Sequence, residues 1–424
     1  MGCKGLHQAI RENTRFVSVK QFSHKRCAID AYSWLHRAAY SDVKQVTSGL
    51  VSKKVTASII RKVKTLLNYS IDCVFVFDGV SLPSKKKTDE LRRSQRATSL
   101  EKAAQYRNKS DRKNEFKYLS AAVSVSWEQV KDLIDNLREL NIKYLVAPYE
   151  ADSQLAFLNY QNYVDFIFSE DSDLLLYGAK VMLTKYESDG TCIMIKQEAL
   201  IQCDILPVRY STSAVWTLLC CLSGCDYTDG IKGIGIKKGA KVLVKTLEML
   251  EIDVHNIADD QIKKIFKKAC EQITDHLSEN TEIIDELTNA FLTFRYHWVY
   301  DPISQQCVNI SKVENCSAEI SALIGPKIEN DELKKLVSGS IHPITKVKEA
   351  KQYEYELNLS QLNNFGDIES DEKENIDHYN ETIFSKPLKR RYATVKKNAP
   401  EVETFPNIDE LFPLLEELKK SKQN

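Results

Sequence analysis

Short apolar runs that lead into acidic residues recur along the first half of this chain. Two of them end at Asp30 and Asp78, and two more, residues 142–146 and 165–168, are followed by acidic pairs. Residues 31–68, which separate the first two runs, carry the apolar periodicity of helices. Strands that alternate with helices in this way predict an α/β fold with a parallel sheet.

The acidic residues at these strand ends should lie close together, because the carboxyl ends of neighbouring parallel strands converge on one crevice. Carboxylates crowded there need cations, since like charges a few ångströms apart otherwise force some of them to take up protons. The set consists of Asp30, Asp78, Glu150, Asp152, Asp171, Asp173 and Asp226.

The ligand chemistry of this set points to particular metals. Oxygen ligands without Cys or His select Mg²⁺ or Mn²⁺ over Zn²⁺. Two such ions about 4 Å apart stabilise the attacking and leaving oxygens when a phosphodiester is cleaved. A single acid at a strand end is usually a cap or turn residue, but five such positions in order are improbable as coincidence. The acids therefore predict phosphate-ester chemistry, and by themselves they also fit a phosphatase.

A strongly basic segment follows Asp78. Residues 81–120 hold twelve basic and five acidic side chains, with many helix-forming residues and few apolar ones. Most runs of this kind are solvated helix faces. The position directly after an acidic strand end instead favours a basic helical element over an active site.

A glycine-rich segment at 231–240 indicates the kind of substrate. Gly233 and Gly235 let the backbone approach a phosphate, and the helix that follows offers free N–H groups and the positive end of its dipole. Lys237 and Lys238 add positive charge. A dinucleotide-binding loop would follow a strand, whereas the preceding residues here read as helical, so a grip on a nucleic-acid backbone fits better.

The composition argues against a membrane or secreted protein. The 424 residues carry 59 basic and 59 acidic side chains, so nucleic-acid affinity must come from local charge. No apolar run approaches the roughly 18 residues of a membrane span, and we expect no signal peptide. The eleven cysteines are expected to be reduced thiols without a structural zinc site.

Three longer strings, together with the start of the chain, carry a family resemblance. They are residues 146–152, 169–175 and 222–227, and the start is Met1 to Leu6. Over roughly residues 1–310 the chain resembles the flap endonuclease (XPG/Rad2-type) superfamily of structure-specific 5′ nucleases. It is most similar to the exonuclease-one branch, which acts in mismatch repair and end resection, because flap endonucleases proper usually have Glu where Asp152 stands.

This resemblance implies a PIN-like nuclease core in which the seven acids hold two Mg²⁺ ions, with Mn²⁺ able to substitute. It also implies that the basic segment forms a helical arch. Lys85 and Arg92 match arch residues that contact the scissile phosphate, and a cation there would stabilise developing charge in catalysis.

The resemblance further implies several contacts with DNA. Tyr32 and His36 match positions that meet unpaired terminal nucleotides, where an aromatic ring can stack on a base. The glycine-rich loop is similar to a helix-two-turn-helix. There a bound K⁺ would be held by Ser223, Gly230 and Ile234.

On this basis we expect five regions, the last of them mostly disordered. They are an N-terminal nuclease region with the start of the arch (1–99), a basic arch and connector (100–137), an internal nuclease region (138–230), the helix-two-turn-helix with a helical extension (231–340), and a tail (341–424) with a short helix at 408–420. The basic cluster at 386–391 reads equally well as a nuclear import signal or as a solvated patch.

The leading hypothesis is a nuclear, Mg²⁺-dependent 5′→3′ exonuclease on double-stranded DNA with flap endonuclease activity, a monomer that acts in DNA repair and recombination. Its substrates would be duplexes with 5′ ends, gaps or flaps, and its tail would recruit mismatch-repair proteins. Two alternatives stay open at this point. One is a flap endonuclease that removes mainly single-stranded 5′ flaps, and the other is a junction-binding scaffold whose nuclease activity is dispensable.

Overall fold

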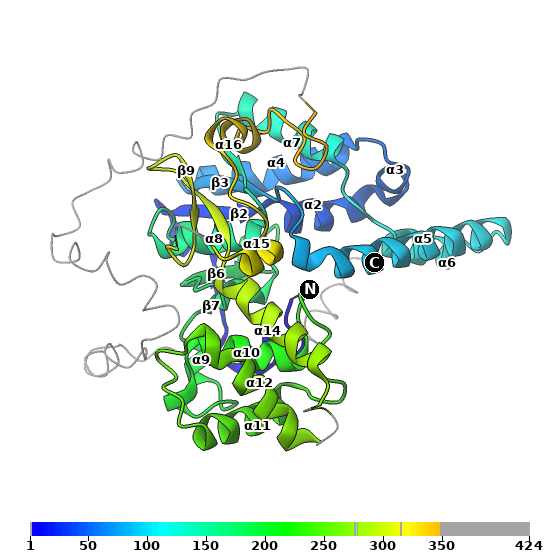
Figure 1. Cartoon of the computed structure of the whole chain (residues 1–424). Helices are drawn as coiled ribbons and strands as arrows, with labels where there is room; N and C mark the ends of the chain where they lie inside the picture. The colour runs from blue at the N-terminus through cyan, green and yellow to red at the C-terminus, as the bar shows by residue number, and fades with distance from the viewer. Residues whose placement is uncertain (1, 275–276, 278, 314–315, 348–424) are drawn as a thin grey trace. The chain divides into compact units, whose positions relative to one another are not determined.

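The computed structural model describes residues 2–347, apart from 275–276, 278 and 314–315. The basic cluster at 386–391 and the predicted helix at 408–420 lie outside the described residues. A seven-stranded sheet lies at the centre of the fold (Figure 1), in the order β1-β7-β6-β5-β2-β3-β4. Its strands are β1 (Arg15–Ser18), β2 (Arg26–Asp30), β3 (Asp72–Phe77), β4 (Lys143–Val146), β5 (Phe166–Phe168), β6 (Val181–Thr184) and β7 (Thr191–Lys196).

The strands from β2 to β6 pair in parallel, as the sequence predicted. They are mostly buried apolar runs, which is the pattern of a parallel sheet covered on both faces. Asp30 at the end of β2 pairs with Val76 of β3, and Ile29 pairs with Phe168 of β5. The residues that follow these strands therefore leave the sheet at one edge.

At the end of the strand order opposite to β4, the sheet is completed by two antiparallel strands, β7 and β1, which were not predicted from the sequence. β6 turns back into β7, and β1 pairs with β7. Arg15 and Phe16 of β1 are exposed, so this strand has no buried apolar run to mark it in the sequence. The sheet is therefore mostly, not entirely, parallel.

Helices cover both faces of the sheet. α4 (Lys53–Asn68) and α7 (Trp127–Glu139) lie in crossovers that step outward from β2 to β3 and β4. α8 (Ala151–Tyr160) steps back from β4 to β5, so the right-handed rule for such crossovers puts it on the opposite face. The shorter helical segments of this part are α1 (Leu6–Ala9), η1 (Arg11–Asn13), η2 (Val19–Phe22), α2 (Ala31–Ala39), η3 (Tyr40–Asp42), α3 (Val43–Thr47) and η5 (Ser172–Leu175).

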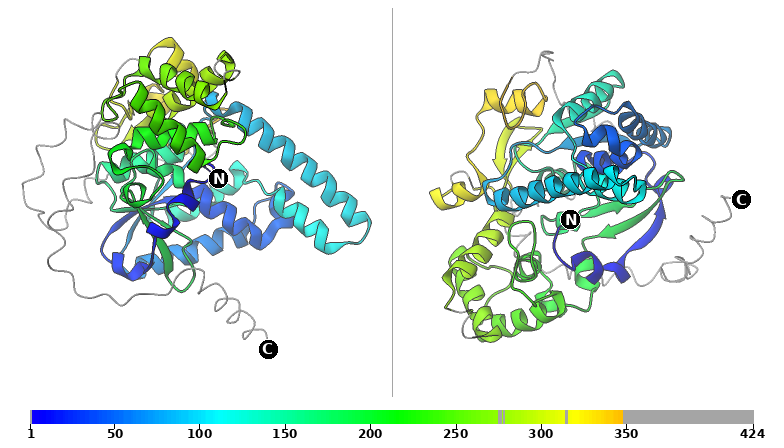
Figure 2. Two further views of the ribbon diagram at one scale, coloured as in Figure 1. Left: turned by 90° about the horizontal axis from the view of Figure 1, so that it is seen from below. Right: turned by 90° about the vertical axis from the view of Figure 1, so that its right-hand side faces the viewer.

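A helical hairpin extends away from the sheet (Figures 1 and 2). It begins with η4 (Pro83–Lys85) and consists of α5 (Lys86–Asn108) and α6 (Arg112–Ala121). Near its tip the stacked rings of Tyr106 and Tyr118 lie 5.3 Å apart, and Arg107 pairs with Glu115 at 2.7 Å. The hairpin is the helical element that the basic segment predicted.

The rest of the described chain is mainly helical and includes a two-stranded sheet. α10 packs on α11 and α14, and β8 packs on α8. None of the described helices is both long and apolar enough to cross a membrane. The elements are α9 (Ala199–Gln202), η6 (Val208–Tyr210), α10 (Ser213–Ser223), α11 (Ile236–Met249), α12 (Asp259–Ile273), α14 (Thr281–Arg295), β8 (Trp298–Asp301), β9 (Gln306–Asn309), α15 (Ala318–Ile324) and α16 (Asn330–Val337).

The cysteines agree with the sequence analysis. All eleven lie within the described residues, and all are free thiols. Cys225 and Cys316 are partly exposed and the others are buried. Most of them therefore act as small apolar residues of the core.

Candidate active site

The seven predicted acids gather where the parallel strands end. Asp30 ends β2 and caps α2, where its Oδ1 accepts a hydrogen bond from the Ser33 N–H at 2.9 Å. Its Oδ2 accepts from the Ser169 hydroxyl, beyond β5, at 2.7 Å. Asp78 follows β3 and accepts from the Ala151 N–H at 2.8 Å. These bonds cross between neighbouring strand ends and hold both carboxylates in place.

The other five acids come from three further segments. Glu150 is the N-cap residue of α8, and Asp152 lies in the first turn of that helix. Asp171 caps η5 and accepts from the Asp173 N–H at 3.0 Å. Asp226 follows α10. Helix starts suit carboxylates, because free N–H groups and the helix dipole favour negative charge there.

Two cations from the base of the hairpin reach into the acid cluster. The Lys85 ammonium lies 2.6 Å from Glu150 Oε1 and 3.0 Å from Asp226 Oδ2. Arg92 Nη2 lies 2.8 Å from Asp226 Oδ1, and the Thr88 hydroxyl donates to the Asp226 carbonyl at 2.7 Å. Burial, the largest single influence, raises the pKa of Glu150, but the Lys85 charge, the nearby His297 and the hydrogen bonds from Lys85 and Tyr227 together hold that pKa below its ordinary value.

The remaining five acids have no ion pair among the described residues. Burial raises the pKa of Asp30 to about 7 and that of Asp78 to about 6, and nearby carboxylates add to both shifts. Burial, followed by the Asp171 charge, raises the pKa of Asp152 and of Asp173 well above the ordinary value. The acids therefore form one electrostatically connected group.

The donor set fits a divalent cation in its chemistry. Within residues 2–347, the gaps aside, no three His, Cys, Asp or Glu side chains are already drawn together so as to hold a metal ion. The carboxylate pKa values are raised first by burial and then by neighbouring carboxylates, so a nearby cation would favour the charged forms. The Lys85 ammonium between Glu150 and Asp226 shows that a cation is stabilised in this cluster. Oxygen donors of this kind suit Mg²⁺ and Mn²⁺.

The start of the described chain packs directly against two of the acids. The Cys3 N–H donates to Asp173 Oδ1 at 2.6 Å. Gly2 has a φ of +93°, and a Cβ atom there would lie 2.3 Å from Asp171 Oδ1 and 2.6 Å from Asp173 Oδ1. In the sequence, this stretch stands out only as part of the family resemblance. The close approach gives a physical reason for glycine at this position.

Glu170 is a neighbour of the site that the sequence analysis did not identify. Its carboxylate accepts from the Thr184 hydroxyl at 2.5 Å and from the Lys185 N–H at 2.8 Å, and Arg37 of α2 pairs with it at 3.4 Å. These contacts tie the loop that carries Asp171 to β6 and to α2. The only feature of the sequence that could have pointed to Glu170 is its position directly before Asp171.

Tyr32 and His36 lie on α2, close to both the acids and the hairpin. Their ring centroids are 6.5 Å apart. Burial, followed by the Asp78 charge, raises the pKa of Tyr32. Burial, followed by the charges of Arg96 and Arg92, lowers the pKa of His36, which keeps the ring neutral. The structure thus places Tyr32 near Asp78 and His36 near Arg92 and Arg96 of the hairpin, and their contact with nucleotides stays a prediction.

The glycine-rich loop presents its backbone to open space ahead of α11. Gly233 has a φ of +82°, and a Cβ atom at Gly233 or at Gly235, the N-cap residue of α11, would meet nothing within 4 Å. Lys237 and Lys238 are exposed in the first turn of the helix. The arrangement leaves room for a phosphate against the helix N-terminus.

The three residues expected at a K⁺ site are close together. Ser223 ends α10, and its buried hydroxyl has no hydrogen-bond partner in the part of the chain that the structure describes. A Cβ atom on Gly230 would lie 2.7 Å from the Ser223 carbonyl carbon. A Cβ atom on Gly239 would lie 3.4 Å from Ile234 and 3.5 Å from the Ser223 hydroxyl. An unpartnered buried oxygen at this point is compatible with a cation ligand.

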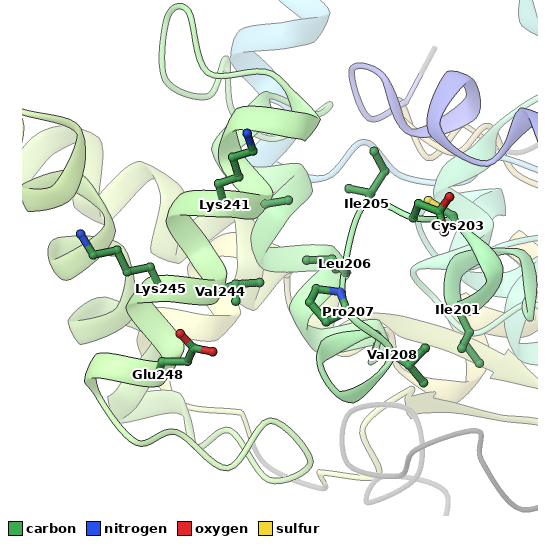
Figure 3. A pocket seen from close by; sticks show the side chains of 12 residues that line it. Ile201, Cys203, Ile205, Leu206, Pro207, Val208, Lys241, Val244, Lys245 and Glu248 are labelled. Atoms are coloured by element: carbon green, nitrogen blue, oxygen red, sulfur yellow. The ribbon is translucent and has the colours of Figure 1, made fainter.

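A pocket of about 610 Å³ lies elsewhere, between α11 and the segment that connects α9 to η6 (Figure 3). Its walls include Leu206 and Val244, with Lys241 and Lys245 beside them. None of the seven acids lines it. The chemistry expected from the sequence is therefore associated with the strand ends and not with this pocket.

Two family models match the chain. The model of the XPG N-terminal domain matches residues 1–99, and that of the XPG I-region matches residues 141–226. The matched ranges include Asp30, Asp78 and Asp226, and the acids of α8 and η5 as well.

The chain is also similar to curated proteins. It is 32% identical over 315 residues to exonuclease 1 of Xenopus laevis, and this match covers 74% of this chain and 41% of that protein. It is 31% identical over 325 residues to the DNA damage-inducible protein DIN7 of Saccharomyces cerevisiae, and this match covers 76% of this chain and 72% of that protein. The chain thus spans about two fifths of the length of the frog protein.

One similar solved structure is the catalytic core of Rad2 in complex with DNA substrate. The match has a TM-score of 0.47 and 21% sequence identity, and it covers 78% of this chain and 88% of that chain.

Proposed function

This chain belongs to the XPG/Rad2 family, on its exonuclease 1 branch, and we propose that it is a Mg²⁺-dependent 5′ nuclease. In this proposal it removes nucleotides in the 5′→3′ direction from double-stranded DNA and also cuts 5′ flaps, as part of DNA repair. The observation that carries the proposal is the single group of seven carboxylates at the strand ends, with Lys85 and Arg92 reaching into it from the base of the hairpin. The frog and yeast relatives carry the words exonuclease and DNA damage in their names.

The acids and the two cations have different roles in this proposal. Asp30, Asp78 and the other acids would hold two Mg²⁺ ions, with Mn²⁺ as a substitute, and these ions would activate water and stabilise the reacting oxygens. Lys85 and Arg92 would bind the scissile phosphate and stabilise its growing negative charge. Their contacts with Glu150 and Asp226 support this assignment, because those contacts put both cations where a phosphate would meet the acids.

The proposed contacts with DNA come from the glycine-rich loop and from α2. The exposed backbone of Gly233 and Gly235, with Lys237 and Lys238, would bind the duplex backbone, and Tyr32 and His36 would meet the unpaired 5′ nucleotides. We also propose K⁺ at Ser223, Gly230 and Ile234, and the unpartnered Ser223 hydroxyl supports this.

Several broader expectations stay with this proposal. They are a nuclear, monomeric protein whose tail recruits mismatch-repair proteins, and the division of the chain at residues 99, 137, 230 and 340. The tail beyond residue 347 lies outside the described residues.

One assay tests the proposed activity. A duplex with a recessed 5′ end, labelled at its 3′ end, is incubated with Mg²⁺ or with EDTA. We expect a ladder that shortens from the 5′ end only with metal, and we expect Asp173→Ala to lose cleavage while it still binds the duplex. Asp189→Ala, which changes an exposed acid of the β6–β7 turn, is the matched control and keeps full activity.

Other outcomes of this assay favour the alternatives. Clean cutting of a 5′ flap without digestion of the recessed duplex favours a flap endonuclease. No cleavage of either substrate, with duplex binding intact, favours a scaffold. Cleavage retained by Asp173→Ala rules out the metal-ligand assignment.

A further inference from the structure

Three ring side chains form a hydrogen-bonded row behind Glu150. The Tyr227 hydroxyl donates to Glu150 Oε2 at 2.7 Å. The hydroxyl oxygens of Tyr227 and Tyr177 lie 2.7 Å apart, and the Tyr177 hydroxyl lies 3.2 Å from His297 Nε2. Tyr177 and His297 are buried, so the row runs from the acid cluster into the core.

The row joins three distant parts of the chain. Tyr227 lies in the loop between α10 and α11, Tyr177 lies just beyond η5, and His297 precedes β8. The rings of Tyr177 and His297 are perpendicular with centroids 5.1 Å apart, and the Tyr227 ring packs edge-on against Phe294 at 4.9 Å. Close packing restricts rotation of the rings, so the hydroxyl groups are held at fixed positions.

All hydrogen bonds of the row can form at once only if each group donates toward Glu150. The ionised Glu150 carboxylate only accepts hydrogen bonds, so the single Tyr227 proton goes to Glu150. Tyr177 then donates to the Tyr227 oxygen. The Tyr177 oxygen is left as an acceptor, so its bond with His297 requires a proton on His297 Nε2.

The surroundings of His297 agree with this tautomer. Its Nδ1 atom is buried and has no hydrogen-bond partner in the described part of the chain. A proton on Nδ1 would leave a buried donor unpaired, which costs about 1–3 kcal/mol. Burial lowers the pKa of His297 to about 4, so the ring is neutral at physiological pH.

We infer that His297, Tyr177 and Tyr227 are positioning residues that orient Glu150 toward a metal ion, an inference that rests on the proposed function. Each bond in the aligned row polarises the next and strengthens the final bond to the carboxylate. The row holds Oε2, while Oε1 faces the cation side, where Lys85 lies at 2.6 Å. Substitutions in the row should therefore change metal affinity and leave DNA affinity unchanged.

Matched substitutions in the full chain test this role. Tyr227→Phe removes the hydroxyl that donates to Glu150 and should raise the Mg²⁺ concentration for half-maximal cleavage about tenfold, as is common for groups that orient metal ligands. Its KM for DNA should not change. Tyr144→Phe is the control, because it deletes a buried hydroxyl whose hydrogen bond goes to the Ser338 carbonyl at 2.9 Å and not to an acid of the cluster. An equal Mg²⁺ requirement in Tyr227→Phe and in the wild-type protein would overturn the inference.

A second pair of variants tests the direction of the row at its far end. A Gln side chain can place an N–H near the position of Nε2, whereas the shorter Asn places its amide near Nδ1. We expect His297→Gln to retain the wild-type Mg²⁺ requirement and His297→Asn to raise it severalfold. Equal losses in both variants would indicate a packing role and contradict the inference.

NMR of the ¹⁵N-histidine-labelled protein tests the tautomer without a cleavage assay. We expect His297 to carry a proton on Nε2 and none on Nδ1 at neutral pH, with His297→Gln used to assign its signals. A proton on Nδ1, or a doubly protonated ring, would overturn the inference.

The Mg²⁺-induced rise in Tm is a further readout that does not need DNA. It should be smaller in Tyr227→Phe than in the wild-type protein and in Tyr144→Phe. If the wild-type protein cleaves no DNA but the tautomer and the Tm shifts are as expected, the proposed function fails and the orientation of Glu150 by the row stands.

Discussion

The acid cluster has two sides that differ in how their charge is compensated. Glu150 and Asp226 have Lys85 or Arg92 within 3.0 Å, and their pKa values are lowered in spite of burial. The other acids are as deeply buried, but none of them forms an ion pair among the described residues, and their pKa values are raised. Among the described residues, side-chain cations pair with these acids only where the hairpin begins. On the other side the negative charge needs a counter-ion from solution.

We call the side with Glu150 and Asp226 the paired side of the cluster and the side with the other five acids the unpaired side. The largest effect on the cleavage rate is expected when the paired side loses Lys85. Lys85→Ala should lower the cleavage rate about 10²- to 10³-fold, or about 3–4 kcal/mol, because it removes the charge that we propose to stabilise the reacting phosphate. Single-turnover cleavage measures this loss. Lys53→Ala, which breaks an ion pair between α4 and Asp132 of α7, is the control and should not change the rate. A loss smaller than about tenfold would show that Lys85 only balances the charge of the acids.

On the unpaired side, neutralising an acid should stabilise the folded protein. Asp30 is buried with a pKa raised to about 7, so the folded protein binds its proton more tightly than the unfolded chain does. Its ionisation therefore lowers stability as the pH rises from about 4 to 7. Asp30→Asn should raise the free energy of unfolding by about 3–4 kcal/mol at pH 8 in EDTA, because the pKa is raised from about 4 to about 7, and this gain should vanish near pH 4.

Urea unfolding at several pH values measures this gain, and saturating Mg²⁺ should remove it by stabilising the wild-type protein. Asp189→Asn is the matched control. The pKa of Asp189 is lowered by hydrogen bonds from Thr191, so that change should not stabilise the protein. A destabilised Asp30→Asn protein in EDTA would mean that the unpaired side is not under electrostatic strain.

A smaller effect is expected from crowding the unpaired side. Gly2→Ala places a methyl group against Asp171 and Asp173 and should lower the cleavage rate about tenfold, about 1.4 kcal/mol. Gly49→Ala separates this clash from backbone strain, since Gly49 also has a positive φ, +74°, but no atom within 4 Å of the added Cβ. Equal activities of the two variants would show that the approach of Gly2 to the acids is not needed.

The smallest effect is expected outside the acid cluster. Lys238→Gln should reduce the slope of log affinity against log salt by about one, which corresponds to about a threefold loss of duplex affinity at moderate salt. The rate at saturating DNA should not change. Lys267→Gln, an exposed change on α12, is the control with an unchanged slope. A change in the saturated rate would move Lys238 from duplex binding to the chemical step.

Sequence reasoning was most successful where the information is local. The apolar runs before Asp30 and Asp78 are sufficient to predict strands, and parallel pairing is sufficient to gather the acids at one edge. The antiparallel strand β1 was missed because its pairing with β7 joins Arg15 to Met194, far apart in the sequence.

The contacts around the acids were harder to predict for the same reason. The bond between His297 and Tyr177 spans 120 residues and that between Cys3 and Asp173 spans 170, and neither has a periodic signature. Contacts that support an acid from a distant part of the sequence are thus revealed only when the chain is folded.

The helical hairpin is anchored to the acids entirely near its base. Lys85, Thr88 and Arg92 make their contacts within η4 and the first two turns of α5. The turn between α5 and α6 lies at the opposite end of a 23-residue helix. Insertions or deletions at that turn would therefore leave the three anchoring residues in register, so evolution and protein engineering can vary the length of the hairpin independently of the groups at its base.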